Sequence, residues 1–329
     1  MQMIGCFLSH LLWLKVKMSL VGIGFLSCIH QFVTDRHGLT IISDRHPGII
    51  QAVRQSTMES GVAHRFCIRH LRDNFKKTYK NVNLVELMYR ASQRTMISEF
   101  EETMRRIEFM NPEAWGRLNR VRKEQWTLCH DGGRRWGAMT TNKSECMNNV
   151  LKGARGLPIT ALIQQTFYRV NDFFVARRES GQMTTSSFMP RLNAKLMDSE
   201  RECQQMRILW YSLERFGVHD RWNNPYDVEL KEIASCECNV PKLYHHPCSH
   251  VMVACMAIRV SYKDYVSKWY TTESYCLTYV PEFLPVRQKG FCPPMNLTLQ
   301  PPDERRKKGR PRNTRRRMAM DERADHFWF

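Results

Sequence analysis

The chain has 329 residues, 43% of them hydrophobic, which is enough for one enlarged domain or two ordinary ones and argues against disorder throughout. Fifty Lys and Arg residues stand against 32 Asp and Glu, so the formal net charge is +18. An excess of this size predicts a polyanionic partner, either nucleic acid or an anionic membrane surface.

The twelve cysteines are unevenly distributed, with one tight cluster near residue 240 that also contains histidines. Disulfide frameworks do not require histidine. The combination therefore favours a reducing compartment and one zinc site.

The N-terminal 29 residues are apolar, but Lys15 and Lys17 interrupt them. No uninterrupted run reaches the roughly 18 residues of a spanning helix, and the basic start and cleavage site of a signal peptide are not evident. We expect a buried strand or helix, or a start inside a longer domain, with a signal peptide as the alternative. No membrane partner is predicted.

The next elements alternate between strand and helix. The β-branched run 39–43 predicts a buried strand that ends at Asp44, and apolar residues then recur at helical spacing. A second strand is expected over 63–68, followed by a helix over 70–77. This β-α-β-α order predicts an α/β layer.

Helical patterns dominate the middle of the chain. They cover 82–123, a helix expected from Thr141 to Val150, and a long amphipathic helix over 159–178. The polar residues 180–187 predict a loop, and the proline-rich residues 281–302 predict an extended segment.

The cysteine cluster has the spacing of a metal site. Cys236 and Cys238 lie two residues apart, a spacing that brings both thiols to one face of an extended strand. After nine intervening residues, Cys248 and His250 repeat it, and a buried helix is expected over 251–256. Three thiolates and one imidazole complete a closed tetrahedral zinc shell of the structural kind.

This Cys-x-Cys and Cys-x-His arrangement, with its Pro-Cys-Ser-His tetrapeptide, is similar to the SWIM-type zinc finger. His245 or His246 could replace one ligand, whereas Cys255 is expected to pack in the core. Because structural zinc sites and their folds form together, chelation is expected to unfold this region.

Three upstream segments extend the resemblance: 42–49 (Ile-Ser-Asp-Arg-His-Pro-Gly-Ile), 66–71 (Phe-Cys-Ile-Arg-His-Leu) and 141–148 (Thr-Asn-Lys-Ser-Glu-Cys-Met-Asn). In order and spacing they resemble the second catalytic Asp, a Cys-x-x-His motif and the third acidic residue of plant Mutator-like transposases. Together with the finger and the basic tail, the resemblance covers about residues 31–317.

The resemblance implies a ribonuclease-H-like fold, on which three carboxylates hold two Mg²⁺ ions for DNA strand cleavage and transfer. Asp44 and Glu145 match the second and third positions. The first belongs on an earlier strand, but no acidic residue precedes Asp35, which is too close to Asp44. We expect a chain shortened at its N-terminal end and inactive, with Mg²⁺ bound only if it is active. Asp44 is otherwise a turn residue and Glu145 a helix N-terminal acid.

Cys67 and His70 lie one helical turn apart and could half-fill a metal site, with Cys129 and His130 as candidate partners. The alternative, which we favour, is a structural pair that packs and orients the neighbouring strands.

The C-terminal tail is strongly basic. Between Arg305 and Arg317, nine of thirteen residues are Lys or Arg, which predicts disorder. Residues 308–312 resemble the AT-hook core, which enters a narrow minor groove, and the run is also typical of a nuclear localisation signal. The residues concerned are Arg305, Arg306, Lys307, Lys308, Arg310, Arg312, Arg315, Arg316 and Arg317.

These observations predict an α/β protein with a partial ribonuclease-H-like domain and helical insertion (1–178), a linker or helical segment (179–225), a small ββα-type zinc finger (226–258), an extended segment (259–302) and a disordered basic tail (303–329). The functional hypothesis is a nuclear, zinc-binding, DNA-associating protein derived from a transposase and catalytically inactive. The alternatives are an active Mg²⁺-dependent transposase whose missing Asp is supplied from elsewhere, and a non-functional transposon remnant. The sequence does not predict the oligomeric state.

Overall fold

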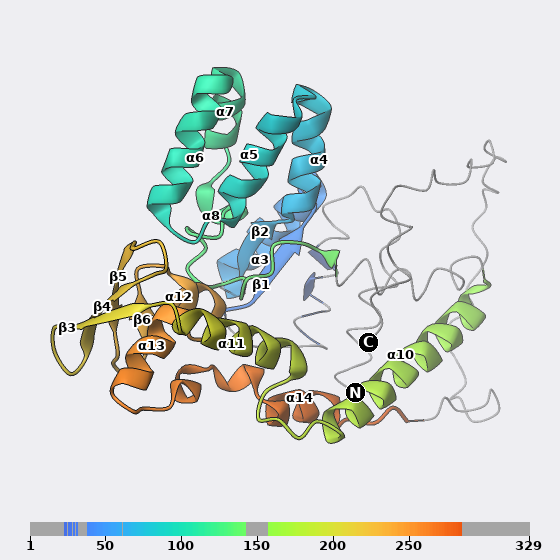
Figure 1. Cartoon of the computed structure of the whole chain (residues 1–329). Coiled ribbons are helices and arrows are strands. Elements are labelled where there is room, and N and C mark those ends of the chain that lie inside the picture. The colour runs from blue at the N-terminus through green and yellow to red at the C-terminus, as the bar shows by residue number, and fades with distance from the viewer. Residues whose placement is uncertain are drawn as a thin grey trace. The chain divides into compact units, whose positions relative to one another are not determined.

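The computed structural model of the chain describes residues 38–60, 62–142 and 157–284, with single positions between 23 and 31 (Figure 1). Within these ranges the protein is mixed α/β, with helices and two small sheets. The predictions for the N-terminal apolar segment, for Glu145 and most of its helix, for most of the proline-rich segment and for the basic tail lie outside the described residues.

Two parallel strands form the first sheet. β1 (Thr40–Ser43) pairs with β2 (Ala63–Phe66), and α3 (Pro47–Ser60) connects them. The carboxyl ends of parallel strands share one edge, and here the Cys67 N–H donates to the Ser43 carbonyl at 2.8 Å. The predicted β-α-β-α order is confirmed by α4 (Ile68–Tyr79). The second strand ends earlier than predicted, because Cys67 is already the N-cap of that helix.

Four further helices follow: α5 (Val82–Gln93), α6 (Ile97–Met110), α7 (Pro112–Asn119) and the short α8 (Lys123–Trp126). Asparagine side chains cap two of them. Asn81 accepts from the Leu84 N–H at 3.1 Å, and Asn111 accepts from the Ala114 N–H at 2.9 Å. Their apolar faces form a core that includes the fully buried Met88, Phe100 and Ile107.

A buried ion group joins β2 to the loop after α8. Asp131 accepts from the Arg65 Nε at 2.6 Å, lies 3.3 Å from the Arg135 Nε, and accepts from the Arg135 backbone N–H at 2.6 Å. The Arg135 guanidinium also donates to the carbonyls of Phe66 and Gln125. Burial lowers the pKa of Arg135 to about 10, although Asp131 opposes the shift.

The long helix α10 (Ile159–Gln182) continues beyond the predicted end, so the loop predicted from residue 180 begins later. The Arg178 guanidinium donates to backbone carbonyls at and after the end of α14 (Thr272–Tyr279), which holds these helices together. No helix in the described ranges is both long and apolar enough to cross a membrane.

The second sheet is antiparallel, in the order β3 (Arg207–Trp210), β4 (Arg215–His219), β5 (Pro225–Glu229) and β6 (Ser235–Cys236). The segment interpreted as a linker or helical stretch (179–225) therefore contains α11 (Pro190–Cys203) and also supplies β3 and β4. In β4 only Phe216 and Val218 carry the apolar alternation, which is too short to predict a strand.

One face of this sheet packs against α13 (Ser249–Ala257), and α11 packs against α13 in the same core. Helix α13 has seven buried residues in succession, Ser249 to Cys255, because it lies inside a second core that α11, the antiparallel sheet and α13 form together. This confirms the buried helix predicted there. The short helix α12 (Val240–Tyr244) lies between β6 and α13 along the chain.

Candidate metal centre

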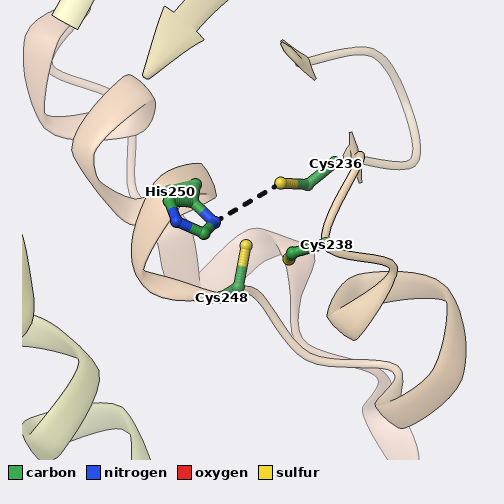
Figure 2. A group of neighbouring side chains, drawn as sticks. All are labelled: Cys236, Cys238, Cys248 and His250. Atoms are coloured by element: carbon green, nitrogen blue, oxygen red, sulfur yellow. Dashed lines mark hydrogen bonds between the residues drawn. The ribbon is translucent and has the colours of Figure 1, made fainter. Parts of the chain in front are cut away.

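The four predicted zinc ligands lie together. The thiols of Cys236, Cys238 and Cys248 and the imidazole of His250 place one ligand atom each within 4.8 Å of all the others. Figure 2 shows the first two on one segment of chain and the last two on the segment facing it. All four residues are between 6% and 8% exposed, so the group is closed to bulk solvent.

The first pair is positioned by a turn. Cys236 is the last residue of β6, and the Asn239 N–H donates back to its carbonyl at 2.9 Å. Asn239 has a positive φ of 59°, a conformation that asparagine tolerates better than most residues. The spacing predicts both thiols on one face of a strand; instead the strand ends at Cys236, and the turn brings Cys238 beside it.

The second pair is positioned by the start of α13. Cys248 is the N-cap of that helix, and its Sγ accepts from the Val251 N–H at 3.5 Å. His250 lies in the first helical turn, and its ring stacks on Tyr226 of β5 at 3.9 Å. This contact fixes the orientation of the imidazole and is not evident from the sequence.

The spacing fits a tetrahedral zinc shell. The Sγ of Cys236 lies 3.6 Å from the Nδ1 of His250. Typical zinc–sulfur and zinc–nitrogen bond lengths at a tetrahedral angle predict a sulfur–nitrogen separation of about 3.6 Å. Three sulfurs and one ring nitrogen fill all four positions, which leaves none for water or substrate. The group therefore fits a structural zinc ion better than a catalytic one.

The three thiols shift one another's ionisation in opposite directions. A hydrogen bond with Cys238 raises the pKa of Cys236 and burial raises that of Cys248, whereas hydrogen bonds from these two thiols lower the pKa of Cys238 far below its usual range. The lowered pKa of Cys238 favours its thiolate, the form that binds zinc.

The other nearby candidates lie outside this group. The His245 Nε2 is 2.8 Å from the Gly133 carbonyl, and its ring packs at a tilt against Trp136, with ring centroids 3.8 Å apart. The His246 Nδ1 is 3.0 Å from the Pro247 carbonyl. Cys255 is fully buried in the second core and, as predicted, does not belong to the metal-ligating group.

The helix between the two ligand pairs is held by a distant loop. A Cβ added to Gly133 would meet the Lys242 carbonyl at 2.4 Å, and one added to Gly137 would meet the Tyr244 ring at 2.3 Å. Both glycines also have positive φ. Glycine is therefore favoured at these positions both by the backbone conformation and by the close approach of α12. Leu243 of α12 is buried in the first core. Loop 131–137 therefore packs directly against the segment that carries the ligands.

The nuclease-like candidates lie at the carboxyl edge of the first sheet. Asp44 directly follows β1, and its Oδ1 accepts from the His46 N–H at 3.1 Å. This hydrogen bond fits the alternative prediction for Asp44, a turn residue at the end of the strand. Cys67 follows β2, and its Sγ accepts from the N–H and the hydroxyl of Thr141 at 3.4 Å each. The edge thus brings residues from all three upstream segments together, since Cys67 contacts Ser43 of the first and Thr141 of the third.

Cys67 and His70 interact, but they do not form a metal site with other described residues. Burial opposes ionisation of the thiol, yet hydrogen bonds from His70 and Thr141 lower the pKa of Cys67 to about 6. The Cys129 Sγ contacts the Nδ1 of its neighbour His130 at 3.1 Å. Among the described residues neither pair, nor Asp44, belongs to a group of three metal-ligating side chains.

No protein-family model matches the chain, and neither a curated protein nor a solved structure matches it significantly.

Proposed function

We propose that Cys236, Cys238, Cys248 and His250 bind one structural Zn²⁺ in a catalytically inactive, DNA-associating nuclear protein of Mutator-like transposase ancestry. The observation that carries the proposal is the convergence of the four buried ligand atoms. A closed Cys₃His set holds a fold together and offers no open coordination position for a reaction.

The charge of the chain supports association with DNA. The excess of Lys and Arg is large, and nine of the positive charges lie between Arg305 and Arg317. Each contact between such a side chain and a phosphate releases counterions and strengthens binding at low salt. The same run supports the proposed nuclear location, since it has the composition of a nuclear localisation signal.

The ancestry is supported by the four motifs and by the placement of Asp44 and Cys67 after neighbouring parallel strands. Catalysis of the family type needs three carboxylates, because Mg²⁺ requires several oxygen ligands. The sequence offers two of them at matching positions, Asp44 and Glu145. This favours a DNA-associating role over strand cleavage.

Metal analysis tests the zinc site. The purified full chain is expected to contain about one zinc per molecule, and Cys236→Ser combined with Cys248→Ser is expected to lose it, because a hydroxyl is a poor zinc ligand. Cys255→Ser is the matched control, since this buried thiol lies outside the group and should leave the zinc content unchanged. Zinc retained by the double variant would refute the assignment.

Salt titration tests the DNA contact. Replacing the nine basic residues from Arg305 to Arg317 by Gln is expected to weaken binding to duplex DNA at low salt and to flatten the dependence of log K on log salt. Each lost phosphate contact removes about 0.9 from the slope. Fluorescence anisotropy from low to moderate salt measures this, and a reporter fusion follows nuclear retention. An unchanged salt slope together with unchanged nuclear retention of the reporter would refute both the DNA contact and the nuclear signal proposed for the tail. The zinc site would be unaffected by that result, because the zinc content tests it separately.

A further inference from the structure

Strand β3 forms one edge of the second sheet, and no other strand among the described residues pairs with its outer side (Figure 1). The Tyr211 N–H donates to the Arg215 carbonyl at 3.1 Å, in register with the β3–β4 ladder. Because hydrogen-bonded positions alternate in antiparallel strands, the backbone groups of Ile208 and Trp210 point away from β4. Within the part of the chain that the structure describes, no backbone hydrogen bond joins these two residues to another segment.

This edge lacks the features that usually prevent pairing. Residues 207–211 (Arg-Ile-Leu-Trp-Tyr) contain no Pro and no Lys. Leu209, Trp210 and Tyr211 are 50%, 53% and 65% exposed. The opposite edge of the sheet differs, because β6 has only two residues and α12 packs against it. The exposed strand therefore offers both backbone hydrogen bonds and apolar side chains to a partner.

The local charge favours a protein partner over nucleic acid. Residues 205–237 contain four Lys or Arg and six Asp or Glu, a net charge of 4 − 6 = −2 within a chain of +18. Arg215 is also paired with Asp227 at 3.3 Å. A phosphate backbone would meet little uncompensated positive charge on this sheet, even though aromatic side chains are exposed there.

We propose that β3 pairs with β3 of a second copy of this chain, antiparallel, about a two-fold axis at Leu209. In this register Ile208 lies opposite Trp210 of the partner subunit, and the outward backbone groups of both exchange two hydrogen bonds. The two copies of Leu209 meet on the axis. A symmetric pairing uses the same surface on both chains. The outward backbone groups of both strands then have hydrogen-bond partners, and the assembly stops at two chains.

Side-chain complementarity selects this register. Arg207 lies opposite Tyr211 of the partner subunit, on the same face of the joined sheet, so that the guanidinium can approach the aromatic ring. A register shifted to place Ile208 on the axis would set Arg207 against Leu209 of the partner subunit and each Tyr211 against Gln205, which precedes the strand. The first register pairs residues 207–211 entirely among themselves, and the joined sheet has eight strands.

Sedimentation velocity of the zinc-loaded full chain tests the pairing. The wild-type protein is expected to shift from monomer to dimer as its concentration rises, and Leu209→Lys is expected to remain monomeric, because two like charges then meet on the axis. Leu213→Lys is the matched control, since this leucine is 79% exposed at the hairpin tip, outside the pairing, and should leave dimerisation intact. Equal zinc content in all variants shows that the finger is folded in each.

Mixing of charge variants tests the register itself. Leu209→Glu alone is also expected to be monomeric, whereas an equimolar mixture of Leu209→Glu and Leu209→Lys should form a heterodimer. A wild-type chain that stays monomeric would overturn the proposal, and so would a mixture that does not associate. A monomeric wild type whose affinity for a single-stranded oligonucleotide falls in Trp210→Ala would instead assign the edge to nucleic acid.

Discussion

Removal of zinc by a chelator is expected to unfold β5, β6, α12 and α13, while the core of α4, α5 and α6 keeps its structure. The four ligand side chains are buried, and without the ion their polar groups lose their partner inside a core. Structural zinc in finger peptides contributes roughly 10–16 kcal/mol, which is comparable to the whole stability of many domains. A site of this kind cannot be lost without loss of its fold.

Amide hydrogen exchange measures this loss segment by segment. Protection of α13 is expected to disappear with the chelator and to return when zinc is added, whereas protection of α5 and α6 should persist. Loop 131–137 should lose part of its protection, because His245 and Lys242 no longer hold it. Full protection of α13 in protein shown to be free of zinc would contradict a folding role for the ion.

A glycine pair separates the loop contact from the metal. Gly133→Ala introduces a Cβ 2.4 Å from the Lys242 carbonyl, whereas a Cβ at Gly132 meets nothing within 4 Å. Both glycines have positive φ, so the two variants share the conformational cost. Gly133→Ala is therefore expected to increase exchange in α12 more than Gly132→Ala does. Equal effects would mean that glycine is required at these positions only for its positive φ, and not for the close approach of the Lys242 carbonyl to Gly133.

The four candidate zinc ligands could be predicted from the sequence to lie together because their chemistry is local. Ligand type, two short spacings and a buried helix directly after them are all contained in about twenty residues. The turn that places Cys238 and the stacking of Tyr226 on His250 could not be predicted. Both depend on how the sheet is built, and its first two strands lie in a segment without a clear strand pattern.

The same limit applies to the first sheet. The first of its two strands was predicted from a β-branched run and the second from its place directly before a helix, and parallel pairing follows from the helix between them. The hydrogen bond between His245 and Gly133 joins residues 112 apart, and the Arg65–Asp131 ion pair joins residues 66 apart. Local periodicity contains no information on such contacts. The sequence Asp131-Gly132-Gly133 predicted only a loop, although it carries the side chain on which two buried arginines depend.

Asp131→Asn is expected to destabilise the protein by about 3–5 kcal/mol, which is typical of a buried pair that loses one partner. The side chains of Asp131 and Arg135 are fully buried, and that of Arg65 is 12% exposed. The amide keeps the shape of the carboxylate and can still accept a hydrogen bond, but it leaves two guanidinium charges without a counterion. Because Arg135 also donates to the Phe66 carbonyl, the end of β2 should loosen with it.

Asp198→Asn is the matched control, since Asp198 pairs with Arg201 at 2.8 Å while both side chains are about 70% exposed. An exposed pair contributes about 0–1 kcal/mol, so urea unfolding of the zinc-loaded protein should show a lower midpoint for Asp131→Asn alone. If the two variants unfold at the same urea concentration, backbone carbonyls suffice to hold Arg135. If they differ as expected, Asp131 stabilises β2 and also loop 131–137, so one carboxylate supports both the carboxyl edge of the first sheet and the segment that carries the zinc ligands.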